Sequence, residues 1–233
     1  MTRGRLFNKH NKTILQLILL SSLACLLMFV IEKFMMPSFF VKSLLRIIIF
    51  SGTIFLYSVT AKDRFELFRF KNIKKKEVIR VLGLAVLVYL LILVGFFLIK
   101  DFIDLNQIKQ NLLTKEKITP QNFLFVSIYI SLINSFLEEM FFRGFIFAKS
   151  IKFNQRKLGY YFSSILFSLY HVSIMDSWFS PILLVLLICG LFVVGVFFNY
   201  LLEKTKSFLS PWLIHSFANL AINTIGFRML GLI

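Results

Sequence analysis

The sequence has little of what soluble, disulfide-stapled or disordered proteins are built from. Only 16% of its 233 residues are charged, and it contains two cysteines and 11 Asp and Glu residues. So few cysteines exclude a disulfide scaffold, and so few charges exclude intrinsic disorder. Apolar residues make up 58% of the chain, including 30 Phe. A soluble domain of this length cannot hide so much apolar surface in one core, so the sequence predicts an all-α integral membrane protein.

Seven apolar stretches are long enough to cross a hydrocarbon core of about 30 Å as helices. We expect three of them in an N-terminal part, residues 1–120, and the other four in a second part, residues 121–233, that carries the chemistry. The expected spans are residues 13–31, 39–60, 79–99, 121–148, 158–176, 181–202 and 211–231.

Basic residues predict how the chain faces the membrane. If the N-terminus is cytoplasmic, the inner segments 1–12, 61–80, 143–157 and 203–210 hold 19 of the 27 Lys and Arg residues. An odd number of spans then leaves the C-terminus outside. The net charge of +16 therefore reflects topology in a lipid bilayer, and it does not indicate nucleic-acid binding. The basic stretch 62–80 either holds anionic lipid or simply orients the chain.

Ionisable side chains within membrane spans are costly and point to function. They gather in the second half of the chain, and the first half shows no comparable set. Lys42, Arg46 and Arg228 are expected to extend their charged ends toward the membrane surface. The second-half residues form three groups: Glu138, Glu139 and Arg143 in the fourth span, Phe167 and His171 in the fifth, and His215 and Asn219 in the seventh.

Helical spacing predicts which of these residues meet. Glu139 and Arg143 are four residues apart, so they form an ion pair on one face. Glu138 is rotated by about 100° from Glu139, so the two carboxylates cannot share a partner equally and Glu138 needs one on another helix. A turn centred near Asn154 places His171 at nearly the same height as Glu138, toward the inner half of the bilayer.

The remaining polar residues follow the same spacing rules. His215 and Asn219 are four residues apart and can converge on one point. Phe167 lies one turn before His171 and forms one wall of its surroundings. Gly190 and Gly195 in the sixth span either allow close helix packing or have no special role.

This set of residues can support two kinds of hydrolysis. Glu138 and His171 can take a proton from water, while His215 and Asn219 donate to the developing oxyanion. Alternatively, Glu138, His171 and His215 can hold Zn²⁺ or another divalent metal with an open position for water. The usual metalloprotease sequence His-Glu-x-x-His is absent. Both routes cleave amides, and both remain open at this stage.

The three groups, in this order, resemble the signature of the CAAX protease and bacteriocin-processing (CPBP, or Abi) family of intramembrane proteases. That signature is Glu-Glu-x-x-x-Arg, then Phe-x-x-x-His, then His-x-x-x-Asn or His-x-x-x-Asp. The resemblance covers about residues 121–225, and Gly144 follows the Arg of the first motif. One departure is Lys206, in the turn before the last motif, where Gly is expected.

The resemblance implies a role for each motif residue. Glu138 would be the base that activates water, assisted by His171. His215 and Asn219 would form the oxyanion hole or complete a metal site. The family is commonly labelled as metalloproteases, although a metal-free glutamate mechanism has been argued for its CAAX-processing members. The supporting residues, which would organise the site, are Glu139, Arg143 and Phe167.

Three functions are consistent with these observations. The first is an endopeptidase that cleaves a peptide or membrane-anchored substrate near the cytoplasmic leaflet. The second is bacteriocin self-immunity, by proteolysis or by binding, as the resemblance implies for some members of the family. The third is a proton-coupled transporter with Glu138 and His171 as a relay, against which the lack of inverted repeats argues. The sequence does not predict the oligomeric state.

Overall fold

The computed structural model describes residues 2–63, 75–175 and 179–233, and all regular secondary structure within these ranges is helical. The predicted all-α class is therefore confirmed for these residues. The α-helices are α1 (Thr2–Val30), α2 (Phe39–Thr60), α3 (Lys75–Ile99), α4 (Leu105–Thr114), α5 (Phe123–Ile128), α6 (Ser135–Glu139), α7 (Ala148–Lys152), α8 (Arg156–Tyr170), α9 (Val172–Met175), α10 (Pro181–Thr205) and α11 (Leu209–Met229).

Five helices of the described residues are long and apolar enough to cross a membrane, so the predicted count of seven is not confirmed. Of the two remaining expected spans, 158–176 and 211–231, the first corresponds to α8, which has only 15 residues. The second corresponds to α11, which has 21 residues but a row of Ser, His and Asn side chains that lower its mean hydropathy. The five candidates are Asn11–Met35, Phe39–Thr60, Lys75–Phe102, Phe123–Lys152 and Pro181–Thr205.

The fourth of these, which we call the long helix (Phe123–Lys152), is one continuous 30-residue element that includes α5, α6 and α7. Its α-helical pieces are joined by two π-helical segments, Tyr129–Asn134 and Met140–Phe147. Segments of this kind occur frequently at functional sites. Here they flank α6, the five-residue piece that carries both glutamates of the first motif.

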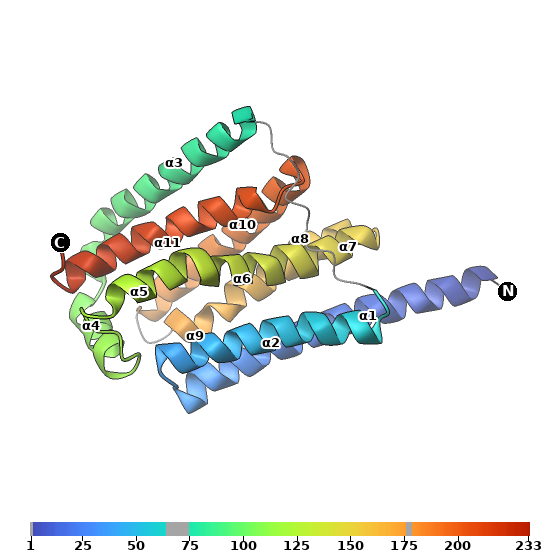
Figure 1. The fold of residues 1–233 in the computed structure, drawn as a ribbon, viewed down its shortest axis with the longest axis horizontal. Helices are drawn as coiled ribbons and strands as arrows, with labels where there is room; N and C mark the ends of the chain where they lie inside the picture. Colours follow the sequence, from blue (N-terminus) through green and yellow to red (C-terminus); the bar gives the residue numbers. More distant parts are fainter. Residues whose placement is uncertain (1, 64–74, 176–178) are drawn as a thin grey trace.

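The helices pack side by side in a bundle (Figure 1). The hairpin of α1 and α2 forms one edge, and α3 packs along α11 at the opposite edge, where Tyr89 and Thr224 hydroxyls lie 3.0 Å apart. The long helix and α8 lie between these edges, and α8 also packs against α10. The two chain ends lie at opposite ends of the bundle.

The N-terminal part and the second part share one hydrophobic core. Phe50 of α2 stacks on Phe141 of the long helix, with ring centroids 4.0 Å apart. Leu17 and Met28 of α1 belong to the same cluster and are fully buried. The boundary near residue 120 therefore separates two parts that support each other, and it stays a prediction as a domain boundary.

Candidate active site

Three helices bring a carboxylate and two imidazoles to one point. The Oε2 atom of Glu138 lies 3.7 Å from Nε2 of His171 and 3.7 Å from Nε2 of His215. Glu138 is 2% exposed, near the middle of the long helix. The predicted meeting of Glu138 and His171 at one height is confirmed, and so is the need of Glu138 for partners on other helices.

His171 is fixed by the backbone of the preceding helix, α8. Its Nδ1 lies 2.7 Å from the carbonyl oxygen of Phe167. A carbonyl can only accept, so Nδ1 carries the hydrogen and Nε2 is the atom presented to Glu138. The Phe167 ring packs edge-on against the imidazole with centroids 4.7 Å apart, as expected of a wall. His171 directly follows Tyr170, the last residue of α8, and so does not lie inside a span that continues to residue 176.

His215 connects the two glutamates of the first motif. Its Nδ1 lies 2.9 Å from Oε1 of Glu139, which also accepts a hydrogen bond of 3.0 Å from Nη1 of Arg143. The predicted Glu139–Arg143 ion pair is therefore confirmed. Nδ1 of His215 donates to the Glu139 carboxylate, so Nε2, on the other side of the ring, faces Glu138. The imidazole therefore contacts both carboxylates, but it is closer to Glu139, at 2.9 Å, than to Glu138, at 3.7 Å. The helix α11 begins at Leu209, two residues before the expected start.

Arg143 is fully buried, and its charge is compensated on several sides. Besides the Glu139 carboxylate, its guanidinium lies 4.1 Å from the centroid of the Phe167 ring and 5.0 Å from that of Phe198. Aromatic faces attract a desolvated cation, so these rings help to hold it. The Arg143 guanidinium thus fixes Glu139, and through Glu139 the orientation of His215.

The sequence did not reveal that Asn134 and Arg46 belong to the site. Asn134 lies one turn before Glu138 and donates a hydrogen bond of 2.8 Å from Nδ2 to Oε1 of that carboxylate. The Oδ1 atom of Asn134 accepts from Nη1 of Arg46, and Nη2 of Arg46 lies 3.0 Å from Oε1 of Glu32. A polar amide one helical turn from a buried glutamate, in an otherwise apolar span, is the signal that could have identified Asn134.

The expectation that the first half of the chain holds no buried polar set is wrong. Arg46 and Lys42 are only 6% and 9% exposed. Their charged ends are therefore buried in the protein, whereas the sequence pattern predicted that they extend toward the membrane surface. Lys42 pairs with Glu116 at 2.6 Å and lies 3.5 Å from Glu32, which is itself 9% exposed. Lys42 and Arg46 are four residues apart on α2, and this shared face was a signal in the sequence.

Asn219 lies one turn after His215 and is tied to the long helix. Its Nδ2 donates a hydrogen bond of 3.0 Å to the carbonyl oxygen of Ile130. An amide nitrogen has two hydrogens, so one remains for another acceptor. The role of Asn219 as a donor to an oxyanion therefore stays a prediction.

Carboxylate and imidazole groups are also the ligand types of metal sites. Among the described residues, no group of three or more His, Cys, Asp and Glu side chains is placed to hold a metal ion. Ligands of a tetrahedral Zn²⁺ with bonds near 2.0 Å lie roughly 3.3 Å apart, and the two Nε2–Oε2 separations at Glu138 are wider, at 3.7 Å. As placed, these side chains are too far apart to bind one Zn²⁺ ion together, and the metal alternative stays a prediction.

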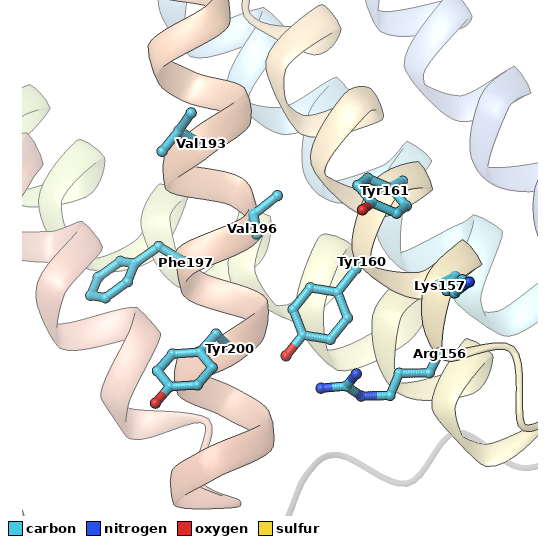
Figure 2. Close-up of a pocket in the computed structure, with 8 residues that line it drawn as sticks. All are labelled: Arg156, Lys157, Tyr160, Tyr161, Val193, Val196, Phe197 and Tyr200. Carbon is cyan, nitrogen blue, oxygen red and sulfur yellow. The ribbon is translucent and has the colours of Figure 1, made fainter.

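A cavity of about 590 Å³ lies elsewhere, between α8 and α10 (Figure 2). Tyr160 and Tyr161 line it from α8, and Val193 and Tyr200 from α10. Its lining includes none of the motif residues. The cavity is therefore separate from the carboxylate–imidazole cluster.

The fold and the site define a polytopic helical membrane protein with a buried carboxylate that faces two imidazoles. The model of the Rce1-like family, type II CAAX prenyl endopeptidases, matches residues 120–221, a range that contains all three motifs. This stretch of the chain matches that family, and the resemblance drawn from the motifs is confirmed. No curated protein and no solved structure matches the chain. The family implies a membrane-embedded protease that acts on peptide or membrane-protein substrates.

Proposed function

We propose that the protein is an intramembrane endopeptidase in which Glu138 activates water for attack on a peptide bond. The observation that carries this proposal is the convergence of Glu138 Oε2 with Nε2 of His171 and of His215, each 3.7 Å away. These separations exceed a direct hydrogen bond of about 2.7–3.2 Å, and contacts of this length are commonly bridged by water. A water molecule seated against the three atoms would contact the base and its assistants together.

The chemistry then proceeds in ordinary steps. Glu138 accepts a proton from the water, the hydroxide oxygen bonds to the peptide carbonyl carbon, and the carbonyl oxygen becomes an oxyanion. His171 accepts a hydrogen bond from the same water and so orients it. The protonated Glu138 carboxyl then donates its proton to the departing amine as the C–N bond breaks.

His215 and Asn219 are proposed to stabilise the oxyanion. Nδ1 of His215 is engaged by Glu139, so donation from Nε2 requires the imidazolium form. Two carboxylates, Glu138 and Glu139, lie against this ring. The second amide hydrogen of Asn219 is the other proposed donor.

The test uses purified protein in liposomes with two probes, a farnesylated CAAX peptide and a panel of single-span peptides with cytoplasmic extensions. We expect cleavage by the wild-type protein, and a loss of about 10²–10⁴-fold in rate for Glu138→Gln and for His171→Ala. Asp101→Asn, at an exposed position outside the site, serves as the matched control. Full cleavage by folded Glu138→Gln protein would overturn the proposal.

Exhaustive chelation separates the two mechanisms. The glutamate route predicts unchanged cleavage after chelation, because Glu138 and His171 act directly on water. Loss of cleavage, with recovery on adding back Zn²⁺ or another divalent metal, would instead support Glu138, His171 and His215 as metal ligands.

The orientation with a cytoplasmic N-terminus is part of this proposal. The N-terminus, the α7–α8 turn and the α10–α11 turn lie at the same end of the bundle (Figure 1). These are the basic segments expected on the inner side. Residues 64–74 of the remaining basic segment lie outside the described residues, so lipid binding by that stretch stays a prediction. Reporter fusions at residues 154 and 233 should report opposite sides of the membrane.

Bacteriocin immunity and proton-coupled transport remain alternatives that no described feature favours. The same liposomes distinguish the transporter, because it would move protons without cleaving any peptide. Immunity by binding alone would persist in a Glu138→Gln variant.

A further inference from the structure

We propose that Arg46, which lies outside the matched range 120–221, is a positioning residue that acts on Glu138 through Asn134. This inference rests on the proposed role of Glu138 as the base. It gives the N-terminal part of the chain a specific task in the reaction, beyond packing against the second part.

The chain of contacts is continuous and buried. Arg46 donates from Nη1 to Oδ1 of Asn134, and Asn134 donates from Nδ2 to Oε1 of Glu138 at 2.8 Å. Arg46, Asn134 and Glu138 are 6%, 7% and 2% exposed, respectively. Burial of this kind leaves little water to replace a missing partner, so each side chain depends on the next.

Arg46 decides which way the Asn134 amide faces. An asparagine amide can turn over, because its oxygen and nitrogen have nearly the same shape. A guanidinium has donors and no acceptor, so the amide must direct Oδ1 toward Arg46. The nitrogen is then the atom left for Glu138. Without Arg46, the amide could present its oxygen to the carboxylate, and two acceptors would face each other.

The direction of this bond determines the direction of the base. With Oε1 of Glu138 held by Asn134, the carboxylate plane is fixed and Oε2 is the oxygen that faces the two imidazoles. Loss of the Asn134 bond would let the carboxylate rotate away from the position where it takes a proton. The result would be slower chemistry without a change in how the substrate is held.

Arg46 is itself held from several elements. Glu32, at the end of the first helix, binds its Nη2 at 3.0 Å, and Glu32 also lies 3.5 Å from Lys42. The guanidinium lies 5.5 Å from the ring centroid of Tyr170, the residue before His171. Lys42 pairs with Glu116, so the connection between α4 and α5 also contributes. This anchoring allows Arg46 to impose one amide orientation.

The experiment measures kcat and KM of liposome-embedded protein with the farnesylated CAAX peptide, or with whichever single-span peptide of the panel the wild type cleaves. For Arg46→Met we expect kcat to fall roughly 10–100-fold, the usual loss for an outer-shell partner, with KM little changed. Arg46→Lys keeps a charged donor but lacks the planar guanidinium that reaches Asn134 and Glu32 from two separate nitrogens, so we expect partial rescue. Arg228→Met, at an exposed arginine of α11, is the matched control.

A second variant addresses the case in which Arg46→Met does not fold. Asn134→Asp keeps an acceptor for Arg46 and adds an ion pair, but it removes the donor to Glu138. We expect folded protein with kcat reduced as in Arg46→Met. In the double variant Arg46→Met with Asn134→Leu, kcat should fall by the same factor as in Asn134→Leu alone. The reason is that Arg46 acts on Glu138 only through Asn134.

Three outcomes would overturn the inference: unchanged kcat in folded Asn134→Asp, unchanged kcat in folded Arg46→Met, or losses that multiply in the double variant. Each is distinguishable from failure of the proposed function, which appears as full activity of Glu138→Gln. If Glu138→Gln is inactive while Asn134→Asp is not impaired, the base assignment stands and only the positioning role fails.

Discussion

His215 and Glu139 are joined by a hydrogen bond of 2.9 Å between Nδ1 and Oε1, and this bond sets the orientation of the imidazole. The same carboxylate neutralises the fully buried Arg143. Glu139 is therefore required by two groups, a cation that would otherwise be buried without a counter-charge and a ring that must face Glu138. Stability and chemistry can be separated experimentally at this residue.

Glu139→Gln should destabilise the protein strongly. It removes the counter-charge of Arg143 in a site with no solvent exposure, and breaking a buried ion pair on one side costs about 3–5 kcal/mol. Unfolding of the detergent-solubilised protein by denaturant measures the change. The double variant Glu139→Leu with Arg143→Met removes both charges and should recover most of the stability. It should not recover cleavage, because His215 has lost its acceptor. Equal stability of the single and double variants would contradict this prediction.

Local spacing was sufficient to predict much of the site. The four-residue separation of Glu139 and Arg143 predicted their ion pair, and equal distances from the turn at Asn154 predicted the meeting of Glu138 with His171. Both follow from regular helical geometry on either side of one short connection. The number of spans was predicted less well, because the polar side chains that build the site also lower the hydropathy of the helix that carries His215.

Contacts between distant segments could not be predicted in this way. Arg46 and Asn134 are 88 residues apart, and no periodicity in either helix indicates that they meet. A lysine or arginine near the end of an apolar span is ordinarily expected to reach the membrane surface. Its partner Glu32 lies in the preceding hairpin arm, and only the packing of three helices makes burial of all these charges acceptable.

Gly195→Ala should disturb the contact between α10 and α8, whereas Gly190→Ala should not. A Cβ at Gly195 would lie 2.9 Å from Cβ and 3.0 Å from Cα of Ser164, so a helix must shift. Overpacking of this kind costs about 1–3 kcal/mol. The same Cβ at Gly190 meets nothing within 4 Å. Of the two alternatives stated for these glycines, close packing therefore applies to Gly195.

The measurement is the denaturant midpoint of both glycine variants in one detergent. Gly190→Ala serves as the matched control, because it makes the same chemical change in the same helix. It should be neutral or more stable by up to about 1 kcal/mol. A destabilisation of equal size in both variants would show that the Ser164 contact is not the cause.

Lys206→Gly should stabilise the turn before α11. Lys206 ends α10 with φ 52° and ψ 27°, a left-handed conformation that is costly for a residue with a side chain, by roughly 1–2 kcal/mol. Glycine, expected here from the family pattern, adopts it freely, and the bond from the Lys206 amide to the Leu202 carbonyl needs no side chain. We expect the free energy of unfolding to rise by about 1 kcal/mol. The control Lys204→Gly lies within α10 and should lower the free energy of unfolding by about 1 kcal/mol. Lower stability in both variants would contradict the prediction.

Asp63→Asn should destabilise the protein in a way that depends on pH. Burial alone raises the pKa of the Asp63 carboxyl, but hydrogen bonds from Lys149 and Lys152 outweigh it and hold that pKa below its ordinary value. Lys149 Nζ lies 2.8 Å from Oδ2. A carboxyl whose pKa is lowered by folding stabilises the folded state above its unfolded pKa of about 3.9, and this contribution disappears as the pH falls through the lower, folded value.

The wild-type protein should therefore exceed Asp63→Asn in stability at pH 7, by about 1 kcal/mol because one of the two lysines is half exposed. The difference should begin to shrink near pH 4 and vanish at lower pH, where Asp63 is protonated in both states. Denaturant midpoints of the two proteins from pH 7 to pH 3 measure it. Asp101→Asn, at an exposed position, should show no such convergence. A stability difference that stays constant across this range would mean that Asp63 acts through packing and not through its charge.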